Sequence, residues 1–255
     1  MMDGRDFYIT LPSDSSLSIY PDNNPCSFKT KLCTPLHLKG QWEVALSEIS
    51  YTHSFYNIWD ENNMVFIRDG TSRVISQFRI PEGYYKNTLQ LTNAIKNGIR
   101  STNQSILEHI DLREDNLSRK CIVRIDNNCE LVLHRHVAKL LGFQNYQTLA
   151  KDQTSQLPID LNRDMHVFYL YTDLIQPTVV GHDVVPLLHT VDVSHNKIGD
   201  VITKSYSTPH YIAVRSNDID EVEININTSS GKPVHFIGGI AIVKLHFRRR
   251  SPLLN

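Results

Sequence analysis

The sequence predicts an all-β fold, a β-sandwich of two antiparallel sheets with a small helical or loop insertion near its middle. Three observations predict it. Apolar and polar residues alternate in about nine or ten short segments, turn-forming residues separate these segments, and helical spacing occurs at only two places. Strands that alternated regularly with helices would instead indicate a parallel sheet. The pattern therefore favours a sandwich.

Strands with one buried face are expected near both ends of the chain. Residues 41–46 (QWEVAL) place Trp42, Val44 and Leu46 on one face, and residues 27–32 (SFKTKL) alternate in the same way. Residues 221–227 (EVEININ) and 240–247 (IAIVKLHF) repeat the pattern near the C-terminus. Each segment has the period of two that a half-buried strand requires.

Two hairpins are expected in the middle of the chain. Residues 64–76 (MVFIRDGTSRVIS) contain Asp69-Gly70, a pair that suits a tight two-residue turn. Residues 121–133 (CIVRIDNNCELVL) contain Asp126-Asn127-Asn128, which tolerate left-handed backbone at a hairpin tip.

The same region carries the two helix signals. Leu91, Ile95 and Ile99 are four residues apart, and Asn87 is placed to cap a helix that begins after it. Residues 136–143 (HVAKLLGF) predict two further turns that end at Gly142. The polar segments 101–120 and 144–163 are expected to be loops or a small insertion.

These elements suggest one domain over residues 1–255. Residues 84–163 form either an insertion between its strands or a small subdomain, and the sequence leaves both open.

The composition is that of an ordinary globular chain, with 40% hydrophobic and 21% charged residues. The formal net charge of −1 gives no chain-wide attraction to nucleic acid or membranes. The N-terminal residues MMDGRDFYIT lack the pattern of a signal peptide, and no apolar run approaches the roughly 20 residues that span a bilayer. We therefore expect a soluble protein made inside the cell, with its four cysteines as free thiols.

Adjacent His182 and Asp183 are the first candidate for chemistry, because such a pair occurs in metal-dependent phosphohydrolases. There the pair lies on a helix, whereas here the flanking residues are mostly β-branched and Gly181 precedes the pair. The sequence thus predicts a turn between two strands.

Other metal-site candidates are weaker. His134 and His136 have the spacing of ligands on one strand, but no acidic residue follows within residues 137–143. His109 and Asp111, with His166, resemble the two-histidine, one-carboxylate set of non-haem iron oxygenases. The basic residue that binds the acid cosubstrate of those enzymes is missing from its expected place. This iron site remains the alternative enzymatic interpretation.

The remaining motif searches find no phosphate-binding loop, no dinucleotide-binding motif and no nucleophile elbow. We therefore predict no catalytic residue, metal ligand or cofactor-binding residue. Arg248, Arg249 and Arg250 form a local basic run, which is a candidate contact for nucleic acid or an acidic partner or else a solvated end.

Three blocks of the sequence resemble a known family. Residues 7–51 (FYITLPSDSSLSIYPDNNPCSFKTKLCTPLHLKGQWEVALSEISY) are similar to the N-terminal block of the minor capsid proteins of Polinton (Maverick) elements. These elements are virus-like transposons related to virophages and adintoviruses. Residues 169–193 (YLYTDLIQPTVVGHDVVPLLHTVDV) and 218–249 (DIDEVEININTSSGKPVHFIGGIAIVKLHFRR) resemble the central and C-terminal blocks.

The resemblance implies a penton protein with a single jelly roll and no catalytic residues. Five copies would form a homopentamer at each icosahedral vertex of the virion, beside a double jelly-roll major capsid protein. The predicted strands are numerous enough for the eight of a jelly roll. If some of the twelve histidines lie at subunit contacts, acidification would loosen the assembly.

A second interpretation from the residues is a glycan-binding jelly roll. The aromatic side chains of Tyr84 and Tyr85, or of Tyr56 and Trp59, would then stack on sugar rings.

Overall fold

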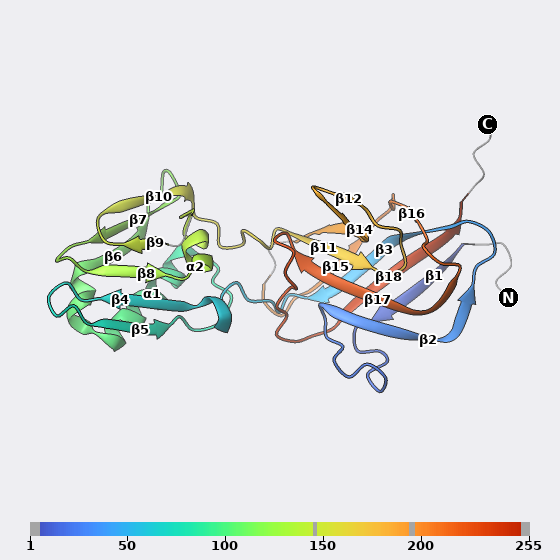
Figure 1. Ribbon diagram of the computed structural model, residues 1–255, viewed down its shortest axis with the longest axis horizontal. Coiled ribbons are helices and arrows are strands. Elements are labelled where there is room, and N and C mark those ends of the chain that lie inside the picture. Colours follow the sequence, from blue (N-terminus) through green and yellow to red (C-terminus); the bar gives the residue numbers. More distant parts are fainter. Residues whose placement is uncertain (1–5, 145–146, 194–196, 251–255) are drawn as a thin grey trace. The chain divides into compact units, whose positions relative to one another are not determined.

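The computed structural model describes residues 6–144, 147–193 and 197–250 and shows an all-β protein built from antiparallel sheets (Figure 1). The chain forms two compact units. Unit 1 combines the chain up to Phe55 with the chain from Asp164 onward, and unit 2 is Tyr56–Arg163. Unit 2 is therefore inserted into the sequence of unit 1.

Unit 1 is a single jelly roll with eight principal strands in two sheets. One sheet has the order β1-β18-β3-β15, and the other has the order β14-β11-β17-β2. Successive strands mostly pass from one sheet to the other, so residues distant in sequence become neighbours (Figure 1). The strands of the first sheet are β1 (Phe7–Pro12), β18 (Ala241–Arg249), β3 (Trp42–Thr52) and β15 (Val201–Ser205), and β16 (Ile212–Ala213) also pairs with β3. Those of the second sheet are β14 (Leu187–Asp192), β11 (Val167–Thr172), β17 (Asp218–Thr228) and β2 (Ser27–His37).

The period-two pattern of the sequence correctly locates four strands of this sandwich, β2, β3, β17 and β18. Trp42, Val44 and Leu46 are buried on β3 as predicted. The strand continues beyond the predicted segment to Thr52, past a bulge where Lys244 pairs with Glu48 but the next residue of β18 pairs with Leu46. The bulge shifts the alternation by one residue, and this hides the second half of the strand from a period-two search.

Aromatic side chains fill the end of the sandwich where the chain leaves for unit 2. The ring of Phe55 lies 5.2 Å from that of Phe168 and 5.9 Å from that of Phe236, centre to centre. The ring of Tyr51 lies 5.8 Å from that of Phe168. Contacts of this edge-on kind stabilise a core beyond the burial of the rings themselves.

Unit 2 has two antiparallel sheets, two α-helices and a hydrophobic core of its own. One sheet has the order β5-β4-β8-β9 and the other β10-β7-β6. The first contains β5 (Ile75–Arg79), β4 (Met64–Arg68), β8 (Glu130–Leu133) and β9 (Gln147–Leu149), and the second contains β10 (Gln153–Pro158), β7 (Lys120–Ile125) and β6 (Ile110–Glu114). The helices are α1 (Thr88–Thr102) and α2 (Arg135–Leu140), with short 3-10 helices η1 (Asp60–Asn62) and η2 (Gln104–His109).

Both predicted helices are present. Asn87 caps α1, and its side-chain oxygen accepts a hydrogen bond of 3.0 Å from the backbone N–H of Gln90. Gly142 follows α2 with a positive φ of 86°, a conformation that ends the helix.

Three expectations about the middle of the chain need correction. Residues 121–133 are not a hairpin, because β7 pairs with β6 and β10 whereas β8 pairs with β4 and β9. Residues 64–76 do form a hairpin, but its turn spans Asp69 to Val74 and the positive φ falls on Arg73. The segments 101–120 and 144–163, expected to be loops or a small insertion, belong to the inserted unit and contain strands β6, β9 and β10.

The inserted unit also differs in extent from the segment 84–163 suggested by the sequence. It begins at Tyr56, because the hairpin β4–β5 packs in the core of unit 2. It contains more strand than helix, since the loops expected at both ends of the segment are paired.

Candidate functional surfaces

The basic run at the end of β18 lies against the beginning of β3. Arg248 pairs with Glu43 in the register of the two strands, and its Nε lies 2.5 Å from a carboxylate oxygen of Glu43. Its guanidinium carbon also lies 3.4 Å from the ring centre of Tyr211, a cation–π contact. Arg248 is thus held within unit 1, and the adjacent carboxylate offsets its charge.

Arg249 and Arg250 follow Arg248 in the chain and are exposed like it. The guanidinium carbon of Arg249 lies 5.9 Å from the ring centre of Trp42. Arg250 donates its backbone N–H to the carbonyl of Gln41 over 3.0 Å. The exposed side chains of these two residues are available to a partner, so the basic contact stays a prediction that rests mainly on them.

His246, two residues before Arg248 on β18, is a titratable residue with specific contacts at its ring and at both ring nitrogens. Its ring stacks on Tyr8 with centres 4.3 Å apart, the hydroxyl of Tyr211 lies 2.7 Å from its Nδ1, and Asp6 lies 3.1 Å from its Nε2. The side chain is nearly buried, and both ring nitrogens have a partner in the fold. The arrangement fixes β1 to β18 and leaves neither nitrogen open to a substrate.

His182 and Asp183 lie at a turn, as the sequence predicts. β12 (Thr178–Val180) and β13 (Asp183–Val185) form a two-stranded hairpin, and Gly181 has a positive φ of 63° between them. His182 is 95% exposed, and its Nε2 lies 3.6 Å from Asp183. The pair therefore lies at the turn of a hairpin, with the His182 side chain in the open.

The residues suggested for an iron site have other partners. His109 Nδ1 lies 2.5 Å from Asp126, and Lys96 Nζ lies 2.7 Å from Asp111. His166 belongs to unit 1, whereas His109 and Asp111 belong to unit 2. The sequence spacing thus does not assemble a three-residue ligand set within one unit.

The histidines of α2 serve the fold of unit 2. His134 precedes the helix and accepts a hydrogen bond from the backbone N–H of His136 at 3.3 Å. The Nε2 of His136 donates to the carbonyl of Asn57 over 2.9 Å. Within the described ranges, no three His, Cys, Asp or Glu side chains are grouped so that they could hold a metal ion.

The aromatic residues proposed for sugar stacking also pack within unit 2. Tyr85 donates its hydroxyl to the carbonyl of Pro81 over 2.7 Å, and its backbone N–H donates to Asn57. The ring of Trp59 lies 5.0 Å from that of His136. All four candidate aromatic side chains are half-buried.

Sequence reasoning missed an acidic pocket of about 400 Å³ beside β17. Its acidic lining comes from Asp173, Asp218, Asp220 and Glu221, and burial raises the pKa of Asp173. The run of acids in residues 218–223 was the available signal. All four carboxylates already have partners: His37 contacts Asp218, Lys31 contacts Asp220, Tyr20 donates to Glu221, and the backbone N–H of Glu223 donates to Asp173 over 2.9 Å.

Exposed valines are a further feature of unit 1. Val179 on β12 is 76% exposed and Val184 on β13 is 67% exposed, and the two residues face each other across the hairpin. No helix in the described part of the chain is long and apolar enough to cross a membrane. The two valines lie on a hairpin that projects from the sandwich (Figure 1).

The fold and these surfaces define a class: a single jelly roll with a second β unit inserted between two of its strands. No protein-family model and no curated protein matches the sequence. Among solved structures, the chain is similar to the crystal structure of the selenomethionine-labelled mavirus penton protein. The similarity has a TM-score of 0.50 at 11% identity and covers 95% of this chain and 99% of the other. At this identity the likeness establishes the fold, and its coverage includes both units.

Proposed function

We propose that the chain is a structural capsid protein, a penton protein that forms a homopentamer at the icosahedral vertices of a Polinton/Maverick-type virion. The observation that carries the proposal is the single jelly roll with an inserted unit, a fold that nearly the whole chain shares with the mavirus penton protein. The three sequence blocks that resemble Polinton minor capsid proteins support the same assignment.

The physical basis of the assembly is closed cyclic symmetry. In a ring of five, one flank of each subunit contacts a different flank of the next, and the rotation closes after five copies. Such a contact needs apolar anchors within a polar rim rather than a reactive centre. The exposed valines of the β12–β13 hairpin would provide anchors of this kind.

The partners follow from the same proposal. Each pentamer would sit beside capsomers of a double jelly-roll major capsid protein. The exposed side chains of Arg249 and Arg250 would provide a basic edge for an acidic surface or nucleic acid.

Mass measurement of the purified chain tests the proposal. Five copies of 29.3 kDa give a particle of about 147 kDa, which light scattering coupled to size exclusion would detect and electron microscopy would show as a five-fold ring. Measurements at pH 8 and pH 5 would test whether protonated histidines loosen it. A stable monomer at high concentration across pH and salt would contradict the proposal.

A further inference from the structure

Unit 1 has an apolar surface besides the β12–β13 hairpin, at the end of the sandwich where the chain leaves for unit 2. Five aliphatic side chains with exposed fractions from 37% to 69% lie in two segments, residues 198–201 and 237–242. They are Ile198, Val201, Ile237, Ile240 and Ile242. We call this surface the Thr52 patch, because the two segments border Thr52 at the end of β3.

The first segment borders Thr52 on the side of β15. Val201, the first residue of β15, pairs with Thr52 in the register of the two strands. Just before it, the backbone N–H of Gly199 donates to the carbonyl of His53 over 2.9 Å. Ile198 is therefore held beside the same end of β3.

The second segment borders Thr52 on the side of β18. The backbone N–H of Ile237 donates to the carbonyl of Ser54 over 3.0 Å. A β-carbon on Gly239 would lie 2.5 Å from the hydroxyl oxygen of Thr52, so the loop passes directly over that side chain. Ile240 follows and leads into β18.

The strand residues of the patch project from the outer face of their sheet. Successive side chains of a strand point to opposite faces. Ile202 on β15 and both Ala241 and Val243 on β18 are buried in the core. Val201 and Ile242 consequently point away from the sandwich.

The side of the patch toward the middle of the sheet is polar. The hydroxyls of Thr203 and Ser50 lie 3.1 Å apart. In the next row, Ser205 donates to Glu48 over 2.7 Å, and Lys244 pairs with Glu48 in the register of β18 and β3. An apolar centre beside such polar groups has the anatomy of a protein–protein interface.

The patch is large enough to contribute to a stable contact. Five aliphatic side chains that are about half exposed present roughly 400 Å² of apolar surface, a size that on a single chain commonly marks an interaction site. One partner of a standard interface contributes about 800 Å², a little more than half of it apolar. The patch thus supplies most of the apolar area that one partner needs.

The symmetry of a closed ring indicates what covers the patch. Each copy in a ring of five must use two different surfaces, because a surface that met its own counterpart would give a pair. The hairpin with Val179 and Val184 joins β11 to β14 in one sheet, whereas the patch lies on β15 and β18 of the other. Among the described residues of unit 1, the other neighbouring exposed aliphatic side chains are Leu17 and Ile19, a smaller surface.

We propose that the β12–β13 hairpin of one copy packs on the Thr52 patch of the next copy in the ring. This inference rests on the proposed pentamer and names the two surfaces that meet in it. Val179 and Val184 contact Val201 and the exposed isoleucines of the neighbour. Each copy gives one hairpin and receives one, so the contact closes after five copies without an unused surface of either kind.

Cysteine cross-linking of the full-length chain tests the inference. In a chain with Cys26→Ser and Cys33→Ser, the variants Val184→Cys and Val201→Cys are co-expressed with distinguishable tags and treated with a short bifunctional maleimide. We expect covalent dimers that join the two variants, and none from either variant alone, because neither surface meets its own counterpart. A chain that carries both substitutions should give a ladder of up to five subunits.

Val74→Cys is the matched control for Val201→Cys, since Val74 is a 57% exposed valine of unit 2. Its dimers with Val184→Cys should form at least tenfold more slowly. Light scattering of each variant before cross-linking should give five copies, which separates a missing contact from lost assembly.

The outcomes distinguish the inference from the proposed function. A pentamer in which Val184→Cys joins Val201→Cys no faster than it joins Val74→Cys or Leu17→Cys would overturn the inference and leave the proposed function standing. Dimers of Val184→Cys with itself would overturn it as well. So would protection of Val201→Cys from a monofunctional maleimide in a dilute monomer, because the patch would then be covered within one copy. A chain that remains a monomer contradicts the proposed function and, with it, the inference.

Discussion

Tyr51 combines deep burial with an unsatisfied hydroxyl. Its side chain is 1% exposed within the aromatic cluster of unit 1, and its oxygen has no hydrogen-bond partner among the residues described. An unpaired buried hydroxyl costs about 1–3 kcal/mol. We expect Tyr51→Phe to raise the free energy of unfolding of unit 1 by roughly 1 kcal/mol, measured by urea denaturation. Tyr169→Phe, on a half-exposed ring, is the control and should change little.

The same residue should make unit 1 sensitive to alkali. Burial, with a smaller effect of Tyr206, raises the pKa of Tyr51 from 10 to about 12. Above pH 10 the unfolded chain loses this proton while the native state keeps it, so stability falls as pH rises from 10 to 12. The loss is roughly 1.4 kcal/mol per pH unit for this group. Unfolding curves at pH 9 and pH 11 should therefore differ less in Tyr51→Phe, and an equal difference in both chains would contradict the assignment.

The four free cysteines should react at very different rates. Burial, followed by the charges of Asp111 and Glu114, raises the pKa of Cys121 to about 12, so its thiolate fraction at pH 8 is only about 10⁻⁴. Cys33 is exposed. We expect a thiol reagent at pH 8 to label Cys33 first and to reach Cys121 only after unfolding. Cys33→Ser should remove the fast phase, and a fast phase that persists would show that another thiol is accessible.

At the scale of elements, Gly70 joins the β4–β5 turn to the connection between β7 and β8. A β-carbon on Gly70 would lie 1.7 Å from the backbone oxygen of Asn127, and a backbone atom cannot move aside as a flexible side chain can. We expect Gly70→Ala to destabilise unit 2 by about 2 kcal/mol or more, as overpacking does. At Gly83 nothing lies within 4 Å of the added carbon, so Gly83→Ala is the matched control and should change the thermal midpoint little.

The β12–β13 hairpin is the element that bears most directly on the proposed assembly. An isolated two-stranded hairpin is marginally stable in water, and the facing valines of this one are exposed in the single chain. If the hairpin packs on a neighbouring copy, Val179→Asp with Val184→Asp should leave the monomer folded and weaken pentamer formation at least tenfold. Leu117→Asp, at a 94% exposed residue of unit 2, is the control. A double variant that assembles like the unchanged chain would place the hairpin outside the contacts.

Several elements were predictable because their pattern depends only on local geometry. β17 and β18 each bury one face, and Asn87 can cap α1 without help from distant residues. The wrong predictions concern which strands pair with each other. β7 and β8 each have the pattern of a strand, and the turn at Asn127 and Asn128 does adopt positive φ, but packing sends the two strands to different sheets. Strand patterns identify a buried face and do not specify which strand lies beside it.

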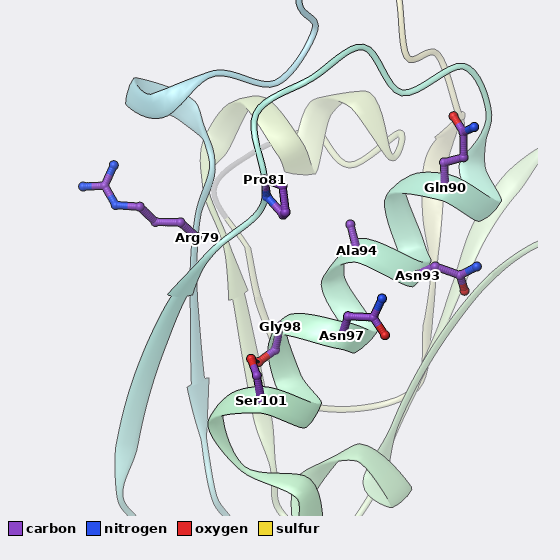
Figure 2. Close-up of a pocket in the computed structure, with 8 residues that line it drawn as sticks. All are labelled: Arg79, Pro81, Gln90, Asn93, Ala94, Asn97, Gly98 and Ser101. Carbon is purple, nitrogen blue, oxygen red and sulfur yellow. Dashed lines mark hydrogen bonds between the residues drawn. The ribbon is translucent and has the colours of Figure 1, made fainter.

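The candidate surface shows the same limit. The sequence reveals three consecutive arginines, but not that Glu43 and Tyr211 lie beside Arg248. A groove of about 510 Å³ between β5 and α1 in unit 2 was missed for a related reason (Figure 2). Its wall on α1 consists of residues that look like an ordinary solvated helix face, and the free edge of β5 exists only once the strand order is known.

At the scale of the whole molecule, the two units have separate cores and are joined through the chain near Phe55 and Asp164. The sequence placed the insertion at residues 84–163 because the helix signal begins there, whereas the strands β4 and β5 before it resemble those of the sandwich. A segment that repeats the strand pattern of its surroundings offers no compositional boundary, and only the sharing of a core shows to which unit it belongs.

This organisation leads to a prediction about which unit carries the contacts of the proposed pentamer. Replacing residues 56–163 by a flexible Gly-Ser linker of about ten residues removes all of unit 2 and none of the eight principal jelly-roll strands. Because the aromatic cluster around Phe168 belongs wholly to unit 1, we expect the shortened chain to keep a cooperative thermal transition and the circular dichroism of a β-protein. If the jelly roll carries the assembly, light scattering should still give five copies. A folded monomer would show instead that unit 2 supplies essential contacts.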